Sequence, residues 1–285
     1  MADREQFLRW LQGWDPQPAT SEDPIDPRSA QALASVLDAP FPEDGRLPPL
    51  WHWVYFLDWA PTAALGEDGH PATGVFLPPL PDRTRMFGGG RVELHGPLRV
   101  GEPARRRSAV VHQEVKQGAT GTLLFVTVRH EIEQHGRLAI TDEQDVMYRS
   151  GAPSVPRPAP RSGPPTVERT WDEPFRAGPL LLFRFSALTA NAHRIHYDHP
   201  YATGVEGYGN LVVHGPLLAV ALAGLVSRRA PGRRIASMRY RFIRPALSGE
   251  ALHLVGHPDP AGTQAALAVL ADDGQPRATG AVSFA

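Results

Sequence analysis

The chain has 285 residues, of which 42% are hydrophobic and 21% are charged, and its formal net charge is −1. This composition is typical of a folded globular protein, and the near-neutral charge argues against general binding to nucleic acid. The chain has no cysteines, so disulfides, thiolate metal sites and a cysteine nucleophile are excluded. The length suits two units of about 140 residues.

The amino-terminal residues MADREQFLRW lack the apolar core of a signal peptide. No run in the sequence approaches the roughly 18 apolar residues that a membrane span requires. We therefore expect a cytoplasmic protein that does not contact membranes. Lys116 is the single lysine among 29 basic residues, so any one arginine carries less information than usual.

In the first half, the pattern predicts an amphipathic helix over residues 28–38. The apolar stretch LWHWVYFL, residues 50–57, is a candidate for a central helix. Strands are expected after it, at residues 92–94, 109–115, 123–132 and 139–148.

Residues 151–165, GAPSVPRPAPRSGPP, hold six prolines in fifteen positions and indicate a semi-rigid linker. The flanking halves show a weak repeat, because RVELHGPLRVGE and RYRFIRPALSGE place a proline and a Gly-Glu pair at the same spacing. The two copies are offset by 148 residues, from Arg91 to Arg239. We expect an amino-terminal unit over residues 1–150, a linker over 151–165 and a carboxy-terminal unit over 166–285.

In the second half, residues 215–226 (GPLLAVALAGLV) are apolar nearly all round. This pattern predicts a buried helix with Pro216 in its first turn. Short strands are expected after it, at residues 235–243, 251–256, 265–270 and 279–284. The expected fold class is α+β, with an antiparallel sheet wrapped around a buried helix.

Polar and titratable side chains crowd the run that precedes this buried helix. They are Asn191, His193, Arg194, His196 and His214. Such groups are poor material for a core, and their position at the start of a buried helix favours an active site.

The run from Phe185, FSALTANAHRIHYDHPYA, resembles the hydratase motif of the MaoC-like, R-specific enoyl-CoA hydratases. The family pattern D-x-N-P-x-H falls on Asn191 to His196, and His214-Gly215 follows at the expected spacing. The first half, in PPLWHWVYFL, GVFLPPLPDRTRMFGGGR and FVTVRHEI, is similar to the degenerate repeat of the mesaconyl- and itaconyl-CoA hydratase branch. This resemblance implies a double hot-dog fold, with two tandem antiparallel sheets that each wrap around a central helix.

The chain departs from the wider motif at three positions. The family's Asp falls on Asn191, its Asn on His193 and its Pro on Arg194, so that His196 alone is retained as a titratable group. These departures question any mechanism that depends on an Asp–His pair.

Catalytic roles are expected at His196, Asn191, Gly215 and His193, and the resemblance assigns the stabilisation of the thioester oxygen to the Gly215 N–H. The imidazole of His196 can take a proton from water and return it to Cα, unless it is simply a packed core histidine. Asn191 can hold the water or serve as a turn residue. The Gly215 N–H, in the first helical turn, would stabilise charge on the thioester oxygen. His193 is either an accessory acid–base group or a surface residue.

Substrate binding is expected at Arg194, His214, Arg244 and Tyr201. Arg194 matches a second carboxylate on the substrate, or it forms a salt bridge to Asp198 or Glu206. Arg244 suits the phosphates of CoA. The three histidines could supply zinc ligands, but their spacing is loose and no metal is expected.

The expected activity is that of a hydro-lyase: reversible hydration of mesaconyl-CoA or itaconyl-CoA to citramalyl-CoA, with no metal or other cofactor. One alternative is dehydration of 3-hydroxyacyl thioesters on an acyl carrier protein. Another is a non-catalytic hot-dog protein that binds acyl-CoA. The expected partner is the acyl-CoA thioester substrate, with the two halves packed as a pseudo-dimer and a homodimer of double hot-dogs left open.

Overall fold

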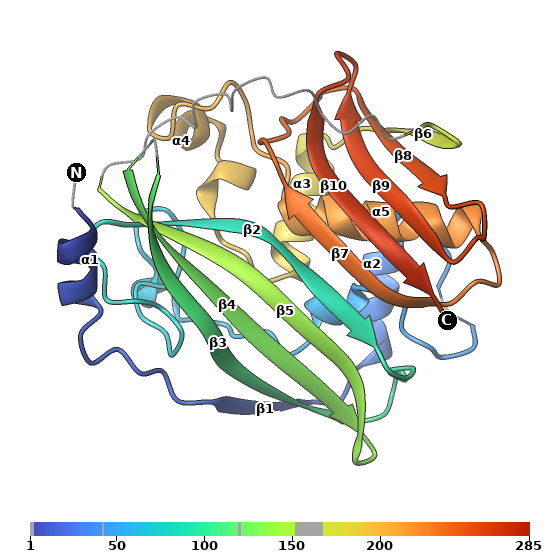
Figure 1. The fold of residues 1–285 in the computed structure, drawn as a ribbon, viewed down its shortest axis with the longest axis horizontal. Helices are drawn as coiled ribbons and strands as arrows, with labels where there is room; N and C mark the ends of the chain where they lie inside the picture. Colours follow the sequence, from blue (N-terminus) through green and yellow to red (C-terminus); the bar gives the residue numbers. More distant parts are fainter. Residues whose placement is uncertain (1–2, 42, 119–120, 152–167) are drawn as a thin grey trace.

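The computed structural model describes residues 3–41, 43–118, 121–151 and 168–285. The expected linker over residues 151–165 therefore lies, except for Gly151, outside the described residues. The strands of the described residues form one ten-stranded antiparallel sheet, and Figure 1 shows helices behind it. Within the described ranges, no helix is both long and apolar enough to cross a membrane.

The described residues form five α-helices and three short 3-10 helices. These are α1 (Arg4–Trp10), α2 (Pro27–Leu37), α3 (Pro179–Leu188), α4 (His199–Gly204) and α5 (Gly215–Arg229), with η1 (Trp51–Val54), η2 (Thr62–Ala64) and η3 (Arg194–His196). The strands are β1 (Ala19–Asp23), β2 (Arg83–Leu94), β3 (Ala104–Gly118), β4 (Gly121–Gln134), β5 (Arg137–Ser150), β6 (Trp171–Phe175), β7 (Ile235–Phe242), β8 (Leu252–Pro258), β9 (Gln264–Ala271) and β10 (Pro276–Phe284). Their order in the sheet is β1-β3-β4-β5-β2-β7-β10-β9-β8-β6.

All the strands expected from the sequence are present, and most are longer than expected. The arginine-rich start of β3 still pairs with β4, because Arg105 and Arg107 lie opposite Glu133 and Glu131 and such cross-strand charges stabilise a sheet. The edge strands β1 and β6 were not predicted, because ATSED and WDEPF are short and carry little apolar pattern.

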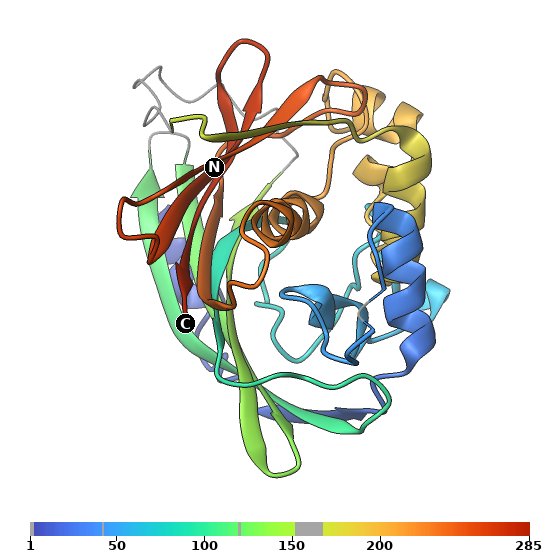
Figure 2. The same cartoon turned by 90° about the vertical axis from the view of Figure 1, so that its right-hand side faces the viewer.

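The two helices predicted with most support, at residues 28–38 and 215–226, are present as α2 and α5. Pro216 lies in the first turn of α5, as expected. Figure 2 looks along α5, which lies against the concave face of the sheet with α2 and α3 on its other side. Nine of the fifteen residues of α5 are buried, so most of its circumference is covered and it forms the centre of the core.

The prediction of a central helix at residues 50–57 is wrong. This stretch forms only the 3-10 turn η1, because Leu50 and Phe56 have positive φ angles of 68° and 54°. A left-handed residue on each side cannot continue a right-handed helix. The turn is held instead by the buried Asp142, whose carboxylate accepts from Trp53 Nε1 (2.8 Å) and lies 3.2 Å from His52 Nε2.

The repeat seen in the sequence is present in three dimensions. β1 pairs with β3 as β6 pairs with β8, with Asp23 opposite Ala104 in one half and Phe175 opposite Leu252 in the other. Ala104 and Leu252 are 148 residues apart, which is the offset of the sequence repeat. The halves meet where β2 pairs with β7, so one sheet is continuous across both.

Candidate active site

The segment between α3 and α5, residues 189–213, is called the motif loop below. It contains η3 and α4 and folds back on itself, because the Val212 N–H donates to the Ile195 carbonyl (2.9 Å). The Val213 N–H then donates to the Ala246 carbonyl (2.8 Å), which fixes the loop to the segment after β7. These two bonds bring the start of the loop beside the start of α5.

His196 lies buried in the motif loop, with 7% of its surface exposed. Its Nδ1 is 2.7 Å from the carbonyl oxygen of Val212. A carbonyl only accepts, so Nδ1 carries the proton of the neutral ring and Nε2 keeps its lone pair. Burial lowers the pKa of His196 to about 4, so near pH 7 the ring is neutral and Nε2 can act as a base.

His214 stacks on His196, with ring centroids 3.6 Å apart and planes 18° apart. Its Nε2 is 2.8 Å from Ser186 Oγ on α3. Its Nδ1 is buried without a hydrogen-bond partner among the described residues. Burial lowers the pKa of His214 well below its usual value, so this ring too is neutral and forms a wall of the site.

His193 extends the cluster on the other side, with its ring 5.5 Å from that of His196. The His193 side chain is half-buried, and burial lowers its pKa to about 2. Asn191 Oδ1 accepts from the backbone N–H of His193 (3.0 Å), and this local turn shapes the loop. Ala190, the residue before it, has a left-handed backbone with φ 50°.

Gly215 is the first residue of α5, directly after His214. A Cβ at this position would lie 2.7 Å from the ring of Phe242, so glycine allows that ring to pack against the helix start. First-turn N–H groups have no intrahelical partner and carry the positive end of the helix dipole. The amide therefore lies next to the stacked histidines, with the properties of an oxyanion donor.

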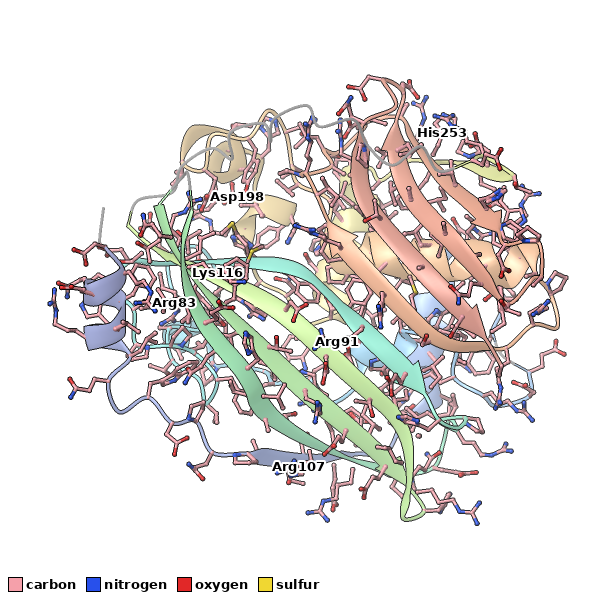
Figure 3. All side chains as sticks on the ribbon, in the orientation of Figure 1. Arg83, Arg91, Arg107, Lys116, Asp198 and His253 are labelled. Atoms are coloured by element: carbon pink, nitrogen blue, oxygen red, sulfur yellow. The ribbon has the colours of Figure 1, made fainter. Side chains whose placement is uncertain are left out.

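Arg194 forms an ion pair with Asp198, with NH2 2.7 Å and Nε 2.9 Å from Oδ2. Its third nitrogen donates to the Glu67 carbonyl (3.1 Å), and the guanidinium lies 4.1 Å from the ring centroid of Tyr201. Of the two alternatives for Arg194, the structure therefore displays the salt bridge to Asp198. Asp198 lies at the start of α4 (Figure 3), where it also caps the helix.

Tyr201 and Arg244 are the two remaining predicted substrate contacts. Tyr201 is buried beneath Arg194, and its hydroxyl donates to Glu206 (3.4 Å). Arg244 follows β7, and its backbone N–H donates to the Arg277 carbonyl (3.3 Å). The structure thus brings together the three histidines, Asn191 and Gly215, and Tyr201 packs against Arg194 of the same loop.

Two residues that sequence reasoning missed come from the other half of the chain. Asp68 Oδ2 lies 2.8 Å from His70 Nδ1, and the ring of His70 packs on His193 with centroids 4.1 Å apart. The short stretch Glu-Asp-Gly-His is typical of a surface turn. No local signal connects it to the motif loop, so only the three-dimensional structure reveals the contact.

A cation could in geometry be held by Asp68, His70 and His193, whose ligand atoms lie within 4.8 Å of one another. The Asp68–His70 contact already uses one oxygen and one nitrogen of this set. The three histidines that were considered as zinc ligands in the sequence, His193, His196 and His214, do not form such a group within the described residues. We assign no metal to either set.

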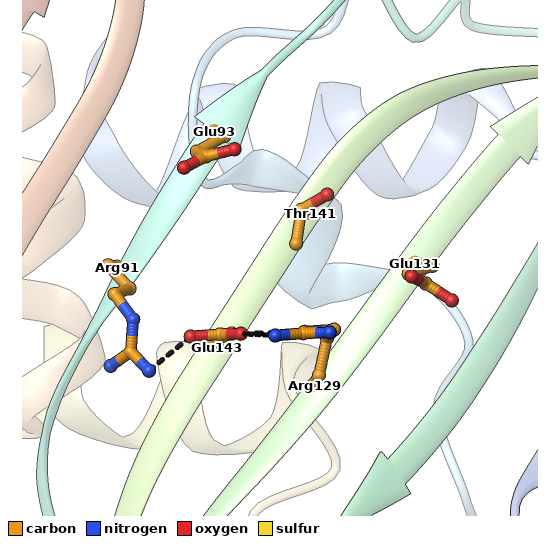
Figure 4. A pocket seen from close by; sticks show the side chains of 6 residues that line it. All are labelled: Arg91, Glu93, Arg129, Glu131, Thr141 and Glu143. Carbon is orange, nitrogen blue, oxygen red and sulfur yellow. Dashed lines mark hydrogen bonds and ion pairs between the residues drawn. The ribbon is translucent and has the colours of Figure 1, made fainter. Parts of the chain in front are cut away.

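Two pockets lie elsewhere, in the N-terminal half. A shallow one surrounds Glu143 on the face of the sheet opposite the helices, where Arg91 and Arg129 both pair with that carboxylate (Figure 4). A cavity of about 450 Å³ lies between β1, β3 and the segment after η1, with Arg106 and His130 in its wall. The residues of the motif loop line neither pocket.

Comparisons with known proteins show the family. Residues 50–248 match the family model described as hydroxyacyl-thioester dehydratase type 2. The chain is 45% identical over 253 residues to mesaconyl-C(4)-CoA hydratase of Chloroflexus aurantiacus, with 88% of this chain and 89% of that protein covered. It is 25% identical over 235 residues to the mitochondrial hydroxyacyl-thioester dehydratase type 2 of Schizosaccharomyces pombe, with 73% and 77% covered.

Solved structures give the fold. A MaoC-like dehydratase from Phytophthora capsici superposes with a TM-score of 0.71 at 14% identity, covering 98% of each chain. HtdX of Mycobacterium tuberculosis superposes with a TM-score of 0.65 at 15% identity, covering 94% of this chain and all of the other. The expected α+β double hot-dog fold is confirmed.

Proposed function

The chain belongs to the hydroxyacyl-thioester dehydratase type 2 family and is a hydro-lyase, and we propose that it reversibly hydrates mesaconyl-CoA or itaconyl-CoA to citramalyl-CoA. The observation that carries the proposal is the neutral, buried His196, with Nδ1 fixed on the Val212 carbonyl and Nε2 left as a base. The 45% identity to a mesaconyl-C(4)-CoA hydratase supports the choice of substrate.

In the proposed reaction with mesaconyl-CoA, whose double bond is conjugated with the thioester, His196 Nε2 takes a proton from water while the water oxygen bonds to Cβ. The double-bond electrons move through Cα to the thioester oxygen, which becomes an enolate. A proton is then added to Cα, and the thioester carbonyl forms again. Water is the one co-reactant, and no electrons enter or leave, so the chemistry proposed here requires no redox cofactor.

The enolate oxygen would be stabilised by the N–H of Gly215, at the start of α5. A preorganised donor of this kind is worth about 2.7–4 kcal/mol in the transition state of other enzymes. His214, with its unpartnered Nδ1 beside the ring of His196, is positioned to contact the substrate. Asn191 holds the backbone that carries His193, and we propose that its amide also orients the water.

Arg194 remains the proposed partner of the free carboxylate on a C5 dicarboxylic ester. Since its guanidinium is already paired with Asp198, the substrate would have to share it with that residue. Tyr201, packed beneath the guanidinium, would keep it in place. Arg244 is proposed to face the CoA phosphates from the end of β7.

The test is to follow enoyl-thioester absorbance with mesaconyl-CoA, itaconyl-CoA and crotonyl-CoA in parallel, with His196→Gln as the inactive control. We expect rapid turnover of a dicarboxylic ester and little turnover of crotonyl-CoA. Turnover of crotonyl-CoA alone would point to fatty-acyl thioesters, the chemistry of the alternative dehydratase. Tight binding of all three esters without turnover would identify a non-catalytic acyl-CoA-binding protein.

A further inference from the structure

The loop of residues 66–70, called the covering loop below, reaches from the N-terminal half onto the motif loop. The backbone N–H of Arg194 donates to the Asp68 carbonyl (2.9 Å), and Arg194 NH1 donates to the Glu67 carbonyl. Gly69, with φ 88°, lies so close that a Cβ would be 1.8 Å from the Ala192 carbonyl oxygen. This approach is open only to glycine, so the contact between the two loops is sterically specific.

The covering loop brings a carboxylate–imidazole pair with it. Asp68 Oδ1 accepts from the backbone N–H of His70 (2.9 Å), and Oδ2 lies 2.8 Å from His70 Nδ1. Burial opposes the charge of Asp68, but the hydrogen bonds and the positive charge of His70 outweigh it and lower the pKa of Asp68 to about 2. An ionised carboxylate only accepts, so Nδ1 carries a proton and Nε2 is the atom of His70 that can exchange one.

His193 connects this pair to the catalytic cluster. Its ring lies 4.1 Å from that of His70 and 5.5 Å from that of His196, which in turn stacks on His214. Burial, followed by the charges of His70 and His196, lowers the pKa of His193 to about 2. The rings of His193, His196 and His214 are all kept neutral, and His70 is the imidazole of the cluster that lies against a carboxylate, 2.8 Å from Asp68 Oδ2.

We propose that His70 is a second catalytic acid–base group of the active site, held in place by Asp68 as a positioning residue. The inference rests on the proposed hydration. It supplies the acid that is missing from the motif, because Asn191 stands where the related motif has a carboxylate, and an amide cannot exchange protons. The acid is delivered from the other half of the chain.

The proton balance gives the two histidines complementary roles. His196 Nε2 takes a proton from water, and the oxygen bonds to Cβ. The His70 imidazolium gives its Nε2 proton to Cα as the enolate collapses to the thioester. The proton left on His196 then returns to His70 through solvent or past His193, so the enzyme ends in its starting state and water has been added across the double bond.

The experiment measures kcat/KM against pH on the best ester, for wild type, His70→Gln, Asp68→Asn and the control Glu67→Gln. Glu67 is exposed in the same loop, and its backbone carbonyl, which binds Arg194, survives the exchange. General acid–base groups typically contribute 10²–10⁴-fold, so we expect His70→Gln to lose ~100-fold or more. It should also lose the alkaline limb of the profile, where the imidazolium gives up its proton, and Glu67→Gln should match wild type.

Other groups interact electrostatically with the pair and must be considered when the limb is assigned. They are His193, His196, Tyr201 and Glu206, and Arg85 acts on His193. A limb that belongs to His70 disappears in His70→Gln and shifts in Asp68→Asn. A limb retained in both variants, at wild-type rates, would overturn the proposal.

Two further measurements separate a catalytic role from a structural one. Added imidazole should restore turnover to a His70→Ala variant whose thermal unfolding midpoint is unchanged, because the small base can occupy the vacated space. Failure of rescue in a folded variant would overturn the proton-transfer role.

If wild type loses activity with EDTA and regains it with Zn²⁺, His70 holds a metal instead. If wild type hydrates none of the esters, the proposed function fails before the pair is tested.

Discussion

In each half of the molecule, two backbone hydrogen bonds join two segments of the chain. One segment precedes α5 or the equivalent turn η1, and the other follows β7 or β2. They run from Val213 to Ala246 (2.8 Å) and Ser248 to Leu211 (2.8 Å) in the C-terminal half, and from Leu47 to Leu98 (2.8 Å) and Val100 to Gly45 (2.9 Å) in the N-terminal half. Leu98 and Ala246, like Val100 and Ser248, keep the 148-residue offset of the repeat, whereas their partners Leu47 and Val213, and Gly45 and Leu211, are 166 residues apart. The two segments therefore occupy equivalent places in the two halves.

At these equivalent places, the C-terminal half has a backbone N–H that the N-terminal half lacks. Gly215 follows Val213 by two residues, and Pro49 follows Leu47 by two residues. Proline has no N–H, so the N-terminal half cannot offer the amide that Gly215 offers. The chain before this point is also shorter: residues 38–50 connect α2 to η1, whereas residues 189–214 connect α3 to α5 and carry the histidines.

The N-terminal half has a long segment where the C-terminal half has a short one. Residues 55–82 separate η1 from β2, whereas residues 230–234 separate α5 from β7. The longer segment includes the covering loop, with Asp68 and His70. The C-terminal half therefore has the central helix and the motif loop. The N-terminal half has only the 3-10 turn η1 at the equivalent place, and its covering loop contacts the motif loop of the C-terminal half.

The largest expected effect distinguishes the buried His196 in the C-terminal half from the half-buried His130 in the N-terminal half. His196→Gln removes the proposed base and should lower kcat/KM by about 10³–10⁴-fold, the upper range for general acid–base catalysis. His130→Gln, in β4 of the N-terminal half and hydrogen-bonded to Ser108 (2.7 Å), should leave kcat/KM within about threefold of wild type. Steady-state kinetics on one ester measures kcat/KM of both variants. Equal losses of kcat/KM in the two variants would contradict the assignment of the catalytic residues to the C-terminal half.

The next effect compares the two central segments as cores. Leu222 is fully buried in α5, and Val54 is buried in η1. Leu222→Ala should lower the free energy of unfolding by about 3 kcal/mol or more, because it removes three carbons and leaves a cavity. Val54→Ala removes two carbons and should cost about 1.6 kcal/mol. Denaturant unfolding at pH 7 measures both, and a larger loss at Val54 would show that η1 supports the fold more than α5 does.

The third effect is the pH dependence of stability. Burial lowers the pKa of His196 and of His130 to about 4, whereas an unfolded histidine titrates near 6.5. Below about pH 6.5 the unfolded chain therefore binds protons that the folded chain does not, and stability falls as the pH falls. Each such histidine contributes a slope of up to about 1.4 kcal/mol per pH unit.

Replacing either histidine with glutamine should remove the contribution of that histidine to the slope, up to about 1.4 kcal/mol per pH unit. The window from pH 6.5 to 5 separates the effect from carboxylates, which titrate lower. Unfolding free energies measured at half-unit steps give the slope. An unchanged slope in His130→Gln would mean that its ring is protonated in the folded protein.

The parts of this comparison that sequence could predict are those with local signals. The apolar run of α5 and the spacing from Asn191 to Gly215 placed the helix and the motif correctly, because both depend on neighbours in the chain. The helix at residues 50–57 was predicted wrongly, since apolar composition does not reveal the left-handed φ of Leu50. The position of His70 depends on a backbone contact of Gly69 with a distant segment, which no local pattern encodes.

The smallest effect is expected at the Arg194–Asp198 pair, which connects the covering loop, the motif loop and α4. If Arg194 also binds the free carboxylate of the substrate, Arg194→Gln should lower kcat/KM about tenfold more on mesaconyl-CoA than on crotonyl-CoA. A difference of this size is what one hydrogen bond to a charged group contributes. Asp198→Asn should leave that ratio unchanged, because it removes the anchor and keeps the cation. Equal losses on both esters in Arg194→Gln would reduce Arg194 to an anchor of the loops, and the specificity for a dicarboxylic acid would then have to arise elsewhere in the site.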